Sequence, residues 1–150
     1  MHETKWRYKS FDELSTHELY EILKIRSEVF IVEQNCPYQD VDGKDPKSYH
    51  FTGWRDEVAV AYVRIIPPGI SYKEASIGRV LTVMSERKKG TGKILMEKAI
   101  ELTLQQFKVS EIKIGAQLYL EKFYMSLGFY QTSPQYMEDG IPHIEMLYAK

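Results

Sequence analysis

The chain has 150 residues, a length typical of a single domain whose core is large enough to fold without metals or cross-links. Its 20 Lys and Arg residues against 21 Asp and Glu residues give a formal net charge of −1, so no overall field attracts it to nucleic acid or to an anionic membrane. The single cysteine, Cys36, excludes an intramolecular disulfide, and no apolar run is long enough for a signal peptide or a bilayer span. We therefore expect one cytoplasmic domain over residues 1–150, with no metal and with no membrane or nucleic-acid partner.

The first element that the sequence predicts is a helix beginning near Ser15. Ser15 and Glu18 have the spacing of a capping box. Arg26 interrupts the apolar stripe of this helix, and an arginine at a half-buried position predicts a structural ion pair with a carboxylate. The apolar stripe consists of Leu19, Ile22, Leu23, Val29 and Phe30.

Strand and helix patterns alternate through the rest of the chain, after an irregular polar loop over 35–47. The order indicates an α+β fold in which one central mixed sheet carries helices on its faces. The predicted elements are a hairpin over 49–55 and 57–66, a strand over 75–83, a helix over 90–107, a strand over 112–117, a short helix over 118–126, and strands over 129–132 and 142–149.

The most informative local pattern is Arg87-x-x-Gly90-x-Gly92, which lies directly between a predicted strand and a predicted helix. Glycines let the main chain approach a ligand, while the free N–H groups of the first helical turn and the helix dipole favour a phosphate. A solvated basic turn is the alternative, but four cationic side chains exceed the need of one phosphate and favour a ligand with several. These side chains are Arg87, Lys88, Lys89 and Lys93.

Two common nucleotide-binding patterns do not match this turn. Arg87 replaces the first glycine of a Walker A loop, and Ile94 replaces its Ser or Thr. Leu95 occupies the position of the third glycine of a dinucleotide-binding fingerprint. An ATPase and a nicotinamide enzyme are therefore disfavoured.

The turn resembles the acetyl-coenzyme A signature of the GNAT superfamily of N-acetyltransferases, R/Q-x-x-G-x-G/A, at every fixed position. The resemblance implies a GNAT fold, acetyl-coenzyme A as co-substrate between the strands that end at 83 and 117, and transfer of the acetyl group to an amine. It implies that loop amides hold the pyrophosphate, that the edge of strand 77–83 pairs with pantetheine, and that the Val83 amide polarises the thioester oxygen. The implied cofactor contacts are Leu81, Thr82, Val83, Arg87, Lys88, Lys89, Gly90, Thr91, Gly92, Lys93, Gln117, Phe123 and Tyr124.

A second segment, 123–129, is similar to the family's Phe/Tyr-x-x-x-Gly-Phe element. The resemblance implies that Tyr124 protonates the departing thiolate. A phenol with a pKa of about 10 can donate to a thiol sulfur whose pKa is about 8.5 without ionising first. The alternative is a tyrosine that only packs the short helix onto the sheet.

Further segments at 29–45, 77–80 and 139–146 resemble ElaA-type acetyltransferases, a resemblance that covers most of the chain without fixing a substrate. In the superfamily, the region after the first helix borders the acceptor site, so carboxylates there would attract a cationic amine. The implied acceptor contacts are Glu33, Asp40, Asp42 and Arg79. A solvated acidic turn is the alternative for Asp42 and Asp45.

An amine must lose a proton before it attacks a thioester, so a base is required. Glu33 and His143 are the candidates, with a structural role as the alternative for the histidine. A small-molecule or peptide amine is the expected acceptor, and its identity and the oligomeric state, including a homodimer, stay open. The rival functions are a non-catalytic acyl-coenzyme A sensor and an acyl-homoserine-lactone synthase that uses an acylated carrier protein.

Overall fold

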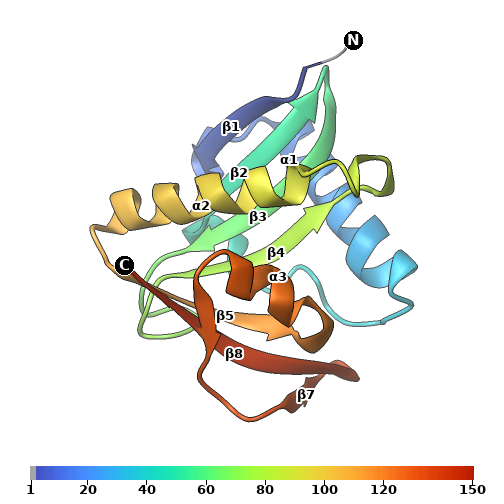
Figure 1. Ribbon diagram of the computed structural model, residues 1–150. Coiled ribbons are helices and arrows are strands. Elements are labelled where there is room, and N and C mark those ends of the chain that lie inside the picture. Colours follow the sequence, from blue (N-terminus) through green and yellow to red (C-terminus); the bar gives the residue numbers. More distant parts are fainter. Residues whose placement is uncertain (1–2) are drawn as a thin grey trace.

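The computed structural model describes residues 3–150, which form eight strands and three α-helices (Figure 1). The strands are β1 (Lys5–Ser10), β2 (Tyr49–Arg55), β3 (Val58–Ile66), β4 (Ser76–Thr82), β5 (Glu111–Gln117), β6 (Phe129–Gln131), β7 (Tyr136–Glu138) and β8 (Ile141–Ala149). The α-helices are α1 (Thr16–Arg26), α2 (Thr91–Phe107) and α3 (Glu121–Ser126). Shorter helical segments are η1 (Phe11–Glu13), the π-helix η2 (Ser27–Glu33), η3 (Asp45–Lys47), η4 (Met84–Glu86) and η5 (Leu118–Leu120).

The α+β fold is confirmed, and the predicted central mixed sheet consists of two antiparallel sheets that a parallel bridge joins. One sheet has the order β1-β2-β3-β4, and the other has the order β5-β8-β6 with β7 also on β8. All strand pairs within these sheets are antiparallel. The two sheets meet through a parallel bridge between Ala75 and Ile112, where the Lys113 amide donates to the Ala75 carbonyl at 2.9 Å. We call the separation of Gly78–Thr82 from Ile114–Gln117 beyond this bridge the β4–β5 split.

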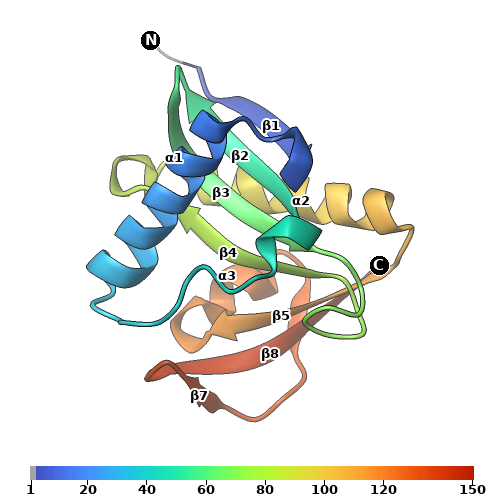
Figure 2. The ribbon, with the colours of Figure 1, turned by 180° about the vertical axis from the view of Figure 1, so that it is seen from behind.

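Helices cover the first sheet on both faces. The helix α2 lies across one face in Figure 1, and α1 lies across the opposite face in Figure 2. On the α2 side, the larger apolar core joins Ala61, Val63 and Ile65 of β3 to Leu95 and Ala99 of α2. This core continues into the second sheet, so a single packed layer holds the two sheets together.

A smaller core lies on the α1 side of β3. Ile22, Ile25 and Val29 pack there against Tyr62 of β3 and Leu81 of β4. The alternation of β3 side chains between the two cores is the period-two pattern of a strand that is buried on both faces.

The predicted start of the first helix is confirmed. Ser15 caps α1, its hydroxyl accepts from the Glu18 amide at 3.0 Å, and the Glu18 carboxylate accepts from the Ser15 amide at 2.8 Å. The helix then loosens into the π-helix η2 rather than continuing to Phe30 as an α-helix. Single-turn π segments occur frequently at functional sites.

The strand β4 contains a bulge that bends its free edge. Pairing with β3 shifts register between Tyr62 and Arg64, and Arg79 on β4 has a left-handed φ of 51°. A bulge adds an unpaired residue and increases the local twist. This bend separates the end of β4 from β5 and so contributes to the β4–β5 split.

Candidate active site

The helix α2 begins without a side-chain cap. Gly90 stands at its N-cap with a φ of 80°, so the N-cap residue has no side chain to accept from the first turn, and that turn contains no acidic residue. The first amides of a helix carry partial positive charge and have no partner within the helix. The Gly90–Thr91–Gly92 corner therefore presents main-chain donors to an anion, which fits the phosphates of a coenzyme A ester.

Glycine at position 92 brings three elements together. A Cβ built there would lie 3.9 Å from Phe123 Cζ and 3.9 Å from Thr82 Cγ2, so it would be in ordinary van der Waals contact with both. The start of α2, the end of β4 and the Phe123 side chain of α3 thus meet at this corner. The predicted cofactor contacts Thr82, Gly92 and Phe123 are neighbours in the structure.

Glu86 contacts the Gly90–Thr91–Gly92 corner through Thr91, and no pattern in the sequence predicted a role for it. It is fully buried, and its carboxylate lies 2.9 Å from the guanidinium of Arg55 and accepts from the Thr91 hydroxyl at 3.4 Å. Lys89, a predicted cofactor contact, has its ammonium 3.9 Å from the same carboxylate. A buried carboxylate needs such partners to compensate its charge. A lone Glu in a turn, however, carries no sequence signal that it will be buried.

The predicted oxyanion role of the Val83 amide is wrong. This amide donates to the Val60 carbonyl of the neighbouring strand at 2.9 Å, and the Val83 carbonyl accepts from the Glu86 amide at 2.9 Å. Because main-chain groups alternate sides along an antiparallel strand, the groups of Leu81 also face β3. Thr82 therefore presents its main chain to the open edge. The main-chain groups of Leu81 and Val83, which were predicted to contact the ligand at this edge, point toward β3 instead.

Arg87 contacts this open edge directly. Its guanidinium donates to the Thr82 carbonyl from Nη2 at 3.0 Å and from Nε at 3.2 Å. Its Nη1 lies 2.8 Å from Oε1 of Glu33 in an ion pair. The predicted cofactor residue Arg87 and the predicted acceptor residue Glu33 are thus brought together.

Gln34, which follows Glu33 in the chain, contacts the other side of the β4–β5 split. Gln34 and Gln117 exchange two amide hydrogen bonds, each of 3.3 Å. Gln117 ends β5, so its side chain lies at the predicted pantetheine side of the split. Two consecutive residues at the end of η2 therefore connect to both strands that border the split.

Tyr124 lies on α3 in the larger core, together with Ala116 of β5. Its ring makes edge contacts with Phe123 at 5.2 Å and with Phe129 at 5.8 Å. Burial raises the pKa of the Tyr124 phenol well above its usual range, and the neighbouring Tyr119 adds to the shift. The hydroxyl is consequently held in the protonated form that a general acid requires.

His143 stands opposite Gln117 in the register of β5 and β8. Its Nδ1 contacts the Ile141 carbonyl at 2.7 Å, and because a carbonyl only accepts, Nδ1 carries the proton. Its Nε2 lies 3.5 Å from the Glu138 carboxylate, and its ring stacks on Tyr136 at 5.8 Å. The buried ring is held in place by these three neighbours, and in the neutral tautomer with the proton on Nδ1 its Nε2 is the acceptor nitrogen.

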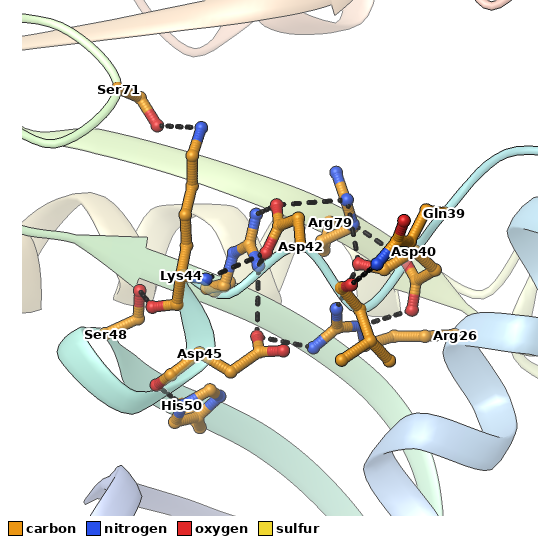
Figure 3. A network of polar contacts seen from close by, with 12 residues as sticks. Arg26, Gln39, Asp40, Asp42, Lys44, Asp45, Ser48, His50, Ser71 and Arg79 are labelled. Atoms are coloured by element: carbon orange, nitrogen blue, oxygen red, sulfur yellow. Dashed lines mark hydrogen bonds and ion pairs between the residues drawn. The ribbon is translucent and has the colours of Figure 1, made fainter.

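The loop after η2 is built around a network of three arginines and three aspartates (Figure 3). Arg26 contacts Oδ2 of Asp40 at 2.9 Å and Oδ1 of Asp45 at 2.7 Å, which confirms the predicted structural ion pair of Arg26. Arg64 binds both carboxylate oxygens of Asp42 at 2.8 Å. Such bidentate pairs are among the stronger polar contacts in proteins.

These contacts change the interpretation of the acidic loop. Burial opposes ionisation of Asp42, but the bonds from Arg64 and from the Lys44 amide outweigh it and hold the pKa of Asp42 well below its usual range. The solvated turn considered for Asp45 is wrong, because Asp45 is 4% exposed and lies against Arg26 and Arg64. The arginines compensate the charge of Asp40 and Asp42, so neither carboxylate is a free anion for an amine.

Between residues 3 and 150, no group of three or more His, Cys, Asp or Glu side chains is arranged to hold a metal ion. The helices of this described range are too short or too polar to cross a membrane.

Known proteins resemble this chain over nearly its whole length. The acetyltransferase (GNAT) domain family matches residues 14–150. Protein ElaA of Escherichia coli (strain K12) is 40% identical over 144 residues, which cover 95% of this chain and 94% of the relative.

Solved structures show the same likeness. The crystal structure of an acyl-CoA N-acyltransferase from Pseudomonas aeruginosa has a TM-score of 0.93 at 38% identity, covering 98% of this chain and 100% of that one. Escherichia coli ElaA has a TM-score of 0.91 at 38% identity, covering 97% and 99%. The AHL synthase LasI has a TM-score of 0.78 at 13% identity, covering 99% and 91%, which is a likeness of fold alone.

Proposed function

Because this chain belongs to the GNAT acetyltransferase family and is an acyltransferase, we propose that it transfers an acetyl group from acetyl-coenzyme A to a primary amine. The acceptor in this proposal is a small molecule or a peptide that carries the amine. A single buried thiol, Cys36, suits the reducing cytoplasm in which we place the reaction.

One observation carries the proposal: the uncapped start of α2 lies beside the open edge of β4. Gly90 and Gly92 keep side chains out of the corner, and the side chain of Thr82 lies next to Gly92. A ligand with a diphosphate and an extended amide arm matches this combination, since helix amides bind phosphate and a strand edge binds amides. Lys88 and Lys93 supply further positive charge around the corner.

In the proposed reaction, the amine attacks the thioester carbonyl directly while both substrates are bound. The C–N bond forms as the C–S bond breaks, the amine proton passes to a base, and the sulfur leaves as a thiol. Tyr124 donates the proton that the sulfur takes, and Glu33 or His143 receives the amine proton, directly or through water. Holding both reactants in one site supplies much of the remaining rate.

Gln117 has a positioning role in this proposal. Its amide stands at the end of β5, where it would hydrogen-bond the pantetheine arm after releasing Gln34. Arg79 shapes the edge of β4 through its bulge, so it acts on the acceptor through main-chain position.

The test is a panel of primary amines incubated with acetyl-coenzyme A, with the released thiol measured. We expect thiol release with at least one amine, and a tenfold or greater rise in the acetyl-coenzyme A KM of the Lys88→Glu, Lys93→Glu double variant. Lys98→Glu, an exposed lysine farther along the same helix, is the matched control and should leave this KM within twofold. Absence of calorimetric binding of acetyl-coenzyme A, together with no thiol release, would overturn the proposal.

A further inference from the structure

The end of η2 holds both sides of the β4–β5 split through two adjacent residues. Glu33 pairs with Arg87, which in turn donates to Thr82 at the end of β4. Gln34 pairs with Gln117 at the end of β5. These contacts join residues 54 and 83 positions apart in the chain, so they are tertiary contacts that hold η2 across the split.

Arg87 has two competing uses. Its guanidinium is directed to the Thr82 carbonyl and the Glu33 carboxylate, although the turn to which it belongs is the proposed phosphate-binding corner. A guanidinium binds phosphate oxygens in the same two-pronged geometry as a carboxylate. A diphosphate at the corner therefore competes with Glu33 for this one side chain.

The ion pair also compensates the charge of Glu33. With Arg87 at 2.8 Å, the Glu33 carboxylate is compensated and attracts a cationic amine weakly. The nearby carboxylates of Asp40 and Asp42 are compensated in the same way by Arg26, Arg64 and Arg79. Glu33 differs from them because its partner belongs to the phosphate-binding turn.

We propose that the Glu33–Arg87 ion pair couples the two substrate sites, so that a phosphate ligand which draws Arg87 away exposes the Glu33 carboxylate to a cationic acceptor amine. The inference rests on the proposed function, and it makes Glu33 an acceptor-binding residue that Arg87 compensates only while the donor is absent. Each substrate then strengthens the binding of the other by the same factor. The accepted amines are those that carry positive charge close to the attacking nitrogen.

The size of the effect follows from the exposure of the pair. The side chains of Arg87 and Glu33 are 39% and 25% exposed, so the pair is partly solvated. Partly exposed ion pairs contribute up to about 1 kcal/mol, which is equivalent to a change of about fivefold in an affinity. Breaking the pair should therefore shift binding by two- to fivefold.

Calorimetric titration with free coenzyme A tests the coupling without turnover. We expect Glu33→Gln to bind coenzyme A two- to fivefold more tightly than the original chain, because no ion pair has to be broken. Raising the salt concentration should reduce this difference, since salt screens the pair. Gln34→Ala removes the neighbouring contact without changing charge, and it is the control whose smaller effect should not depend on salt.

A double-mutant cycle assigns the effect to the pair. In an Arg87→Gln background, Glu33→Gln should no longer change coenzyme A affinity. In the same background, the KM of the best amine of the panel should not vary with the acetyl-coenzyme A concentration, whereas in the original chain it should fall as that concentration rises. Equal or weaker binding by Glu33→Gln would overturn the inference, while no binding by the original chain would overturn the proposed function instead.

Discussion

Nε of Arg79 donates to Oδ1 of Asp40 over 2.7 Å, and this contact joins the bulge of β4 to the loop that follows η2. Arg79 is the residue of β4 with the left-handed φ. Asp40 also holds the fully buried Arg26 of α1 through its other oxygen, at 2.9 Å. One carboxylate therefore fixes a helix, a loop and the strand edge at which we place the donor.

Asp40→Asn should destabilise the fold by about 2 kcal/mol, because the buried Arg26 then keeps Asp45 as its remaining carboxylate partner and loses a charged hydrogen bond. Arg26, which is 0% exposed, is the charge that loses most. Urea unfolding measures the change. Asp12→Asn, at an exposed position of η1, is the control and should stay within about 0.5 kcal/mol of the original chain, and an equal urea midpoint for both variants would contradict the role of Asp40.

Acid should weaken the fold in two stages. Burial lowers the pKa of His50, whose Nε2 donates to the Asp45 carbonyl at 3.1 Å and whose Nδ1 contacts the Tyr62 hydroxyl at 2.6 Å. The unfolded chain, with a histidine pKa of about 6.5, then binds a proton more readily than the folded one, so stability is complete above about pH 6.5 and falls below it.

The second stage belongs to Asp42 and Asp45, whose folded pKa values are both lowered: burial alone would raise them, but the arginine contacts outweigh it. Their contribution is complete above about pH 4 and is lost as the pH falls toward the folded pKa values. Urea midpoints measured from pH 8 to pH 3 test both stages. His50→Gln should flatten the upper stage only, and a constant midpoint between pH 7 and pH 5 in the original chain would contradict it.

Gly90→Ala should raise the coenzyme A Kd beyond what its small loss of folding stability would explain. A Cβ at Gly90 meets no atom of residues 3–150 within 4 Å, so the substitution acts through the φ of 80°, which costs an alanine about 1 kcal/mol. Gly43→Ala is a matched control with a φ of 84° and free space, but it lies outside the corner. Both variants should lose similar stability in urea, and only Gly90→Ala should raise the coenzyme A Kd in calorimetry; equal Kd values would show that the corner tolerates the change.

Gly115→Ala should destabilise the second sheet by about 1–2 kcal/mol through overpacking. A Cβ there would lie 2.9 Å from the Tyr136 hydroxyl and 3.0 Å from the Tyr72 hydroxyl, so both phenols must move. Adding Tyr72→Phe and Tyr136→Phe removes both oxygens and should recover most of the loss. Thermal unfolding of the single variant, the triple variant and the Tyr72→Phe, Tyr136→Phe double variant measures this. A triple variant much less stable than the double variant, which keeps glycine at 115, would argue against steric contact as the cause.

Local signals predicted the elements that carry the proposed site. The capping box at Ser15 and the glycines at 90 and 92 work through near neighbours in the chain, so spacing alone places the starts of α1 and α2. The hairpin of β2 and β3 turns at Asp56, as predicted. The strands β1 and β7 were missed, because β1 alternates only two aromatic residues, Trp6 and Tyr8, with charged ones and β7 has three residues.

Contacts between distant segments could not be predicted in the same way. The direction in which Val83 points its amide depends on the register of β4 with β3 and on the bulge at Arg79, which no local pattern encodes. The division of the sheet depends on the same bend. The pairing of Asp40 and Asp42 with arginines from α1, β3 and β4 likewise arises from tertiary packing, so a loop that is acidic in sequence is compensated in space.

Tyr124→Phe should lower the maximal rate by about 100-fold and leave coenzyme A affinity within twofold, because only the proton donor to the sulfur is removed. The ring contacts with Phe123 and Phe129 survive in phenylalanine, so the melting temperature should change little. Since burial holds the pKa of Tyr124 above its usual range, the rate of the original chain should not fall between pH 8 and pH 9.5 through loss of this proton.

Tyr119→Phe, at a position 72% exposed, is the control for losing a phenol near the same helix. Thiol release at saturating substrates measures the rate, and a Tyr124→Phe enzyme as fast as the original would remove this tyrosine from the chemistry while leaving the donor-binding corner intact.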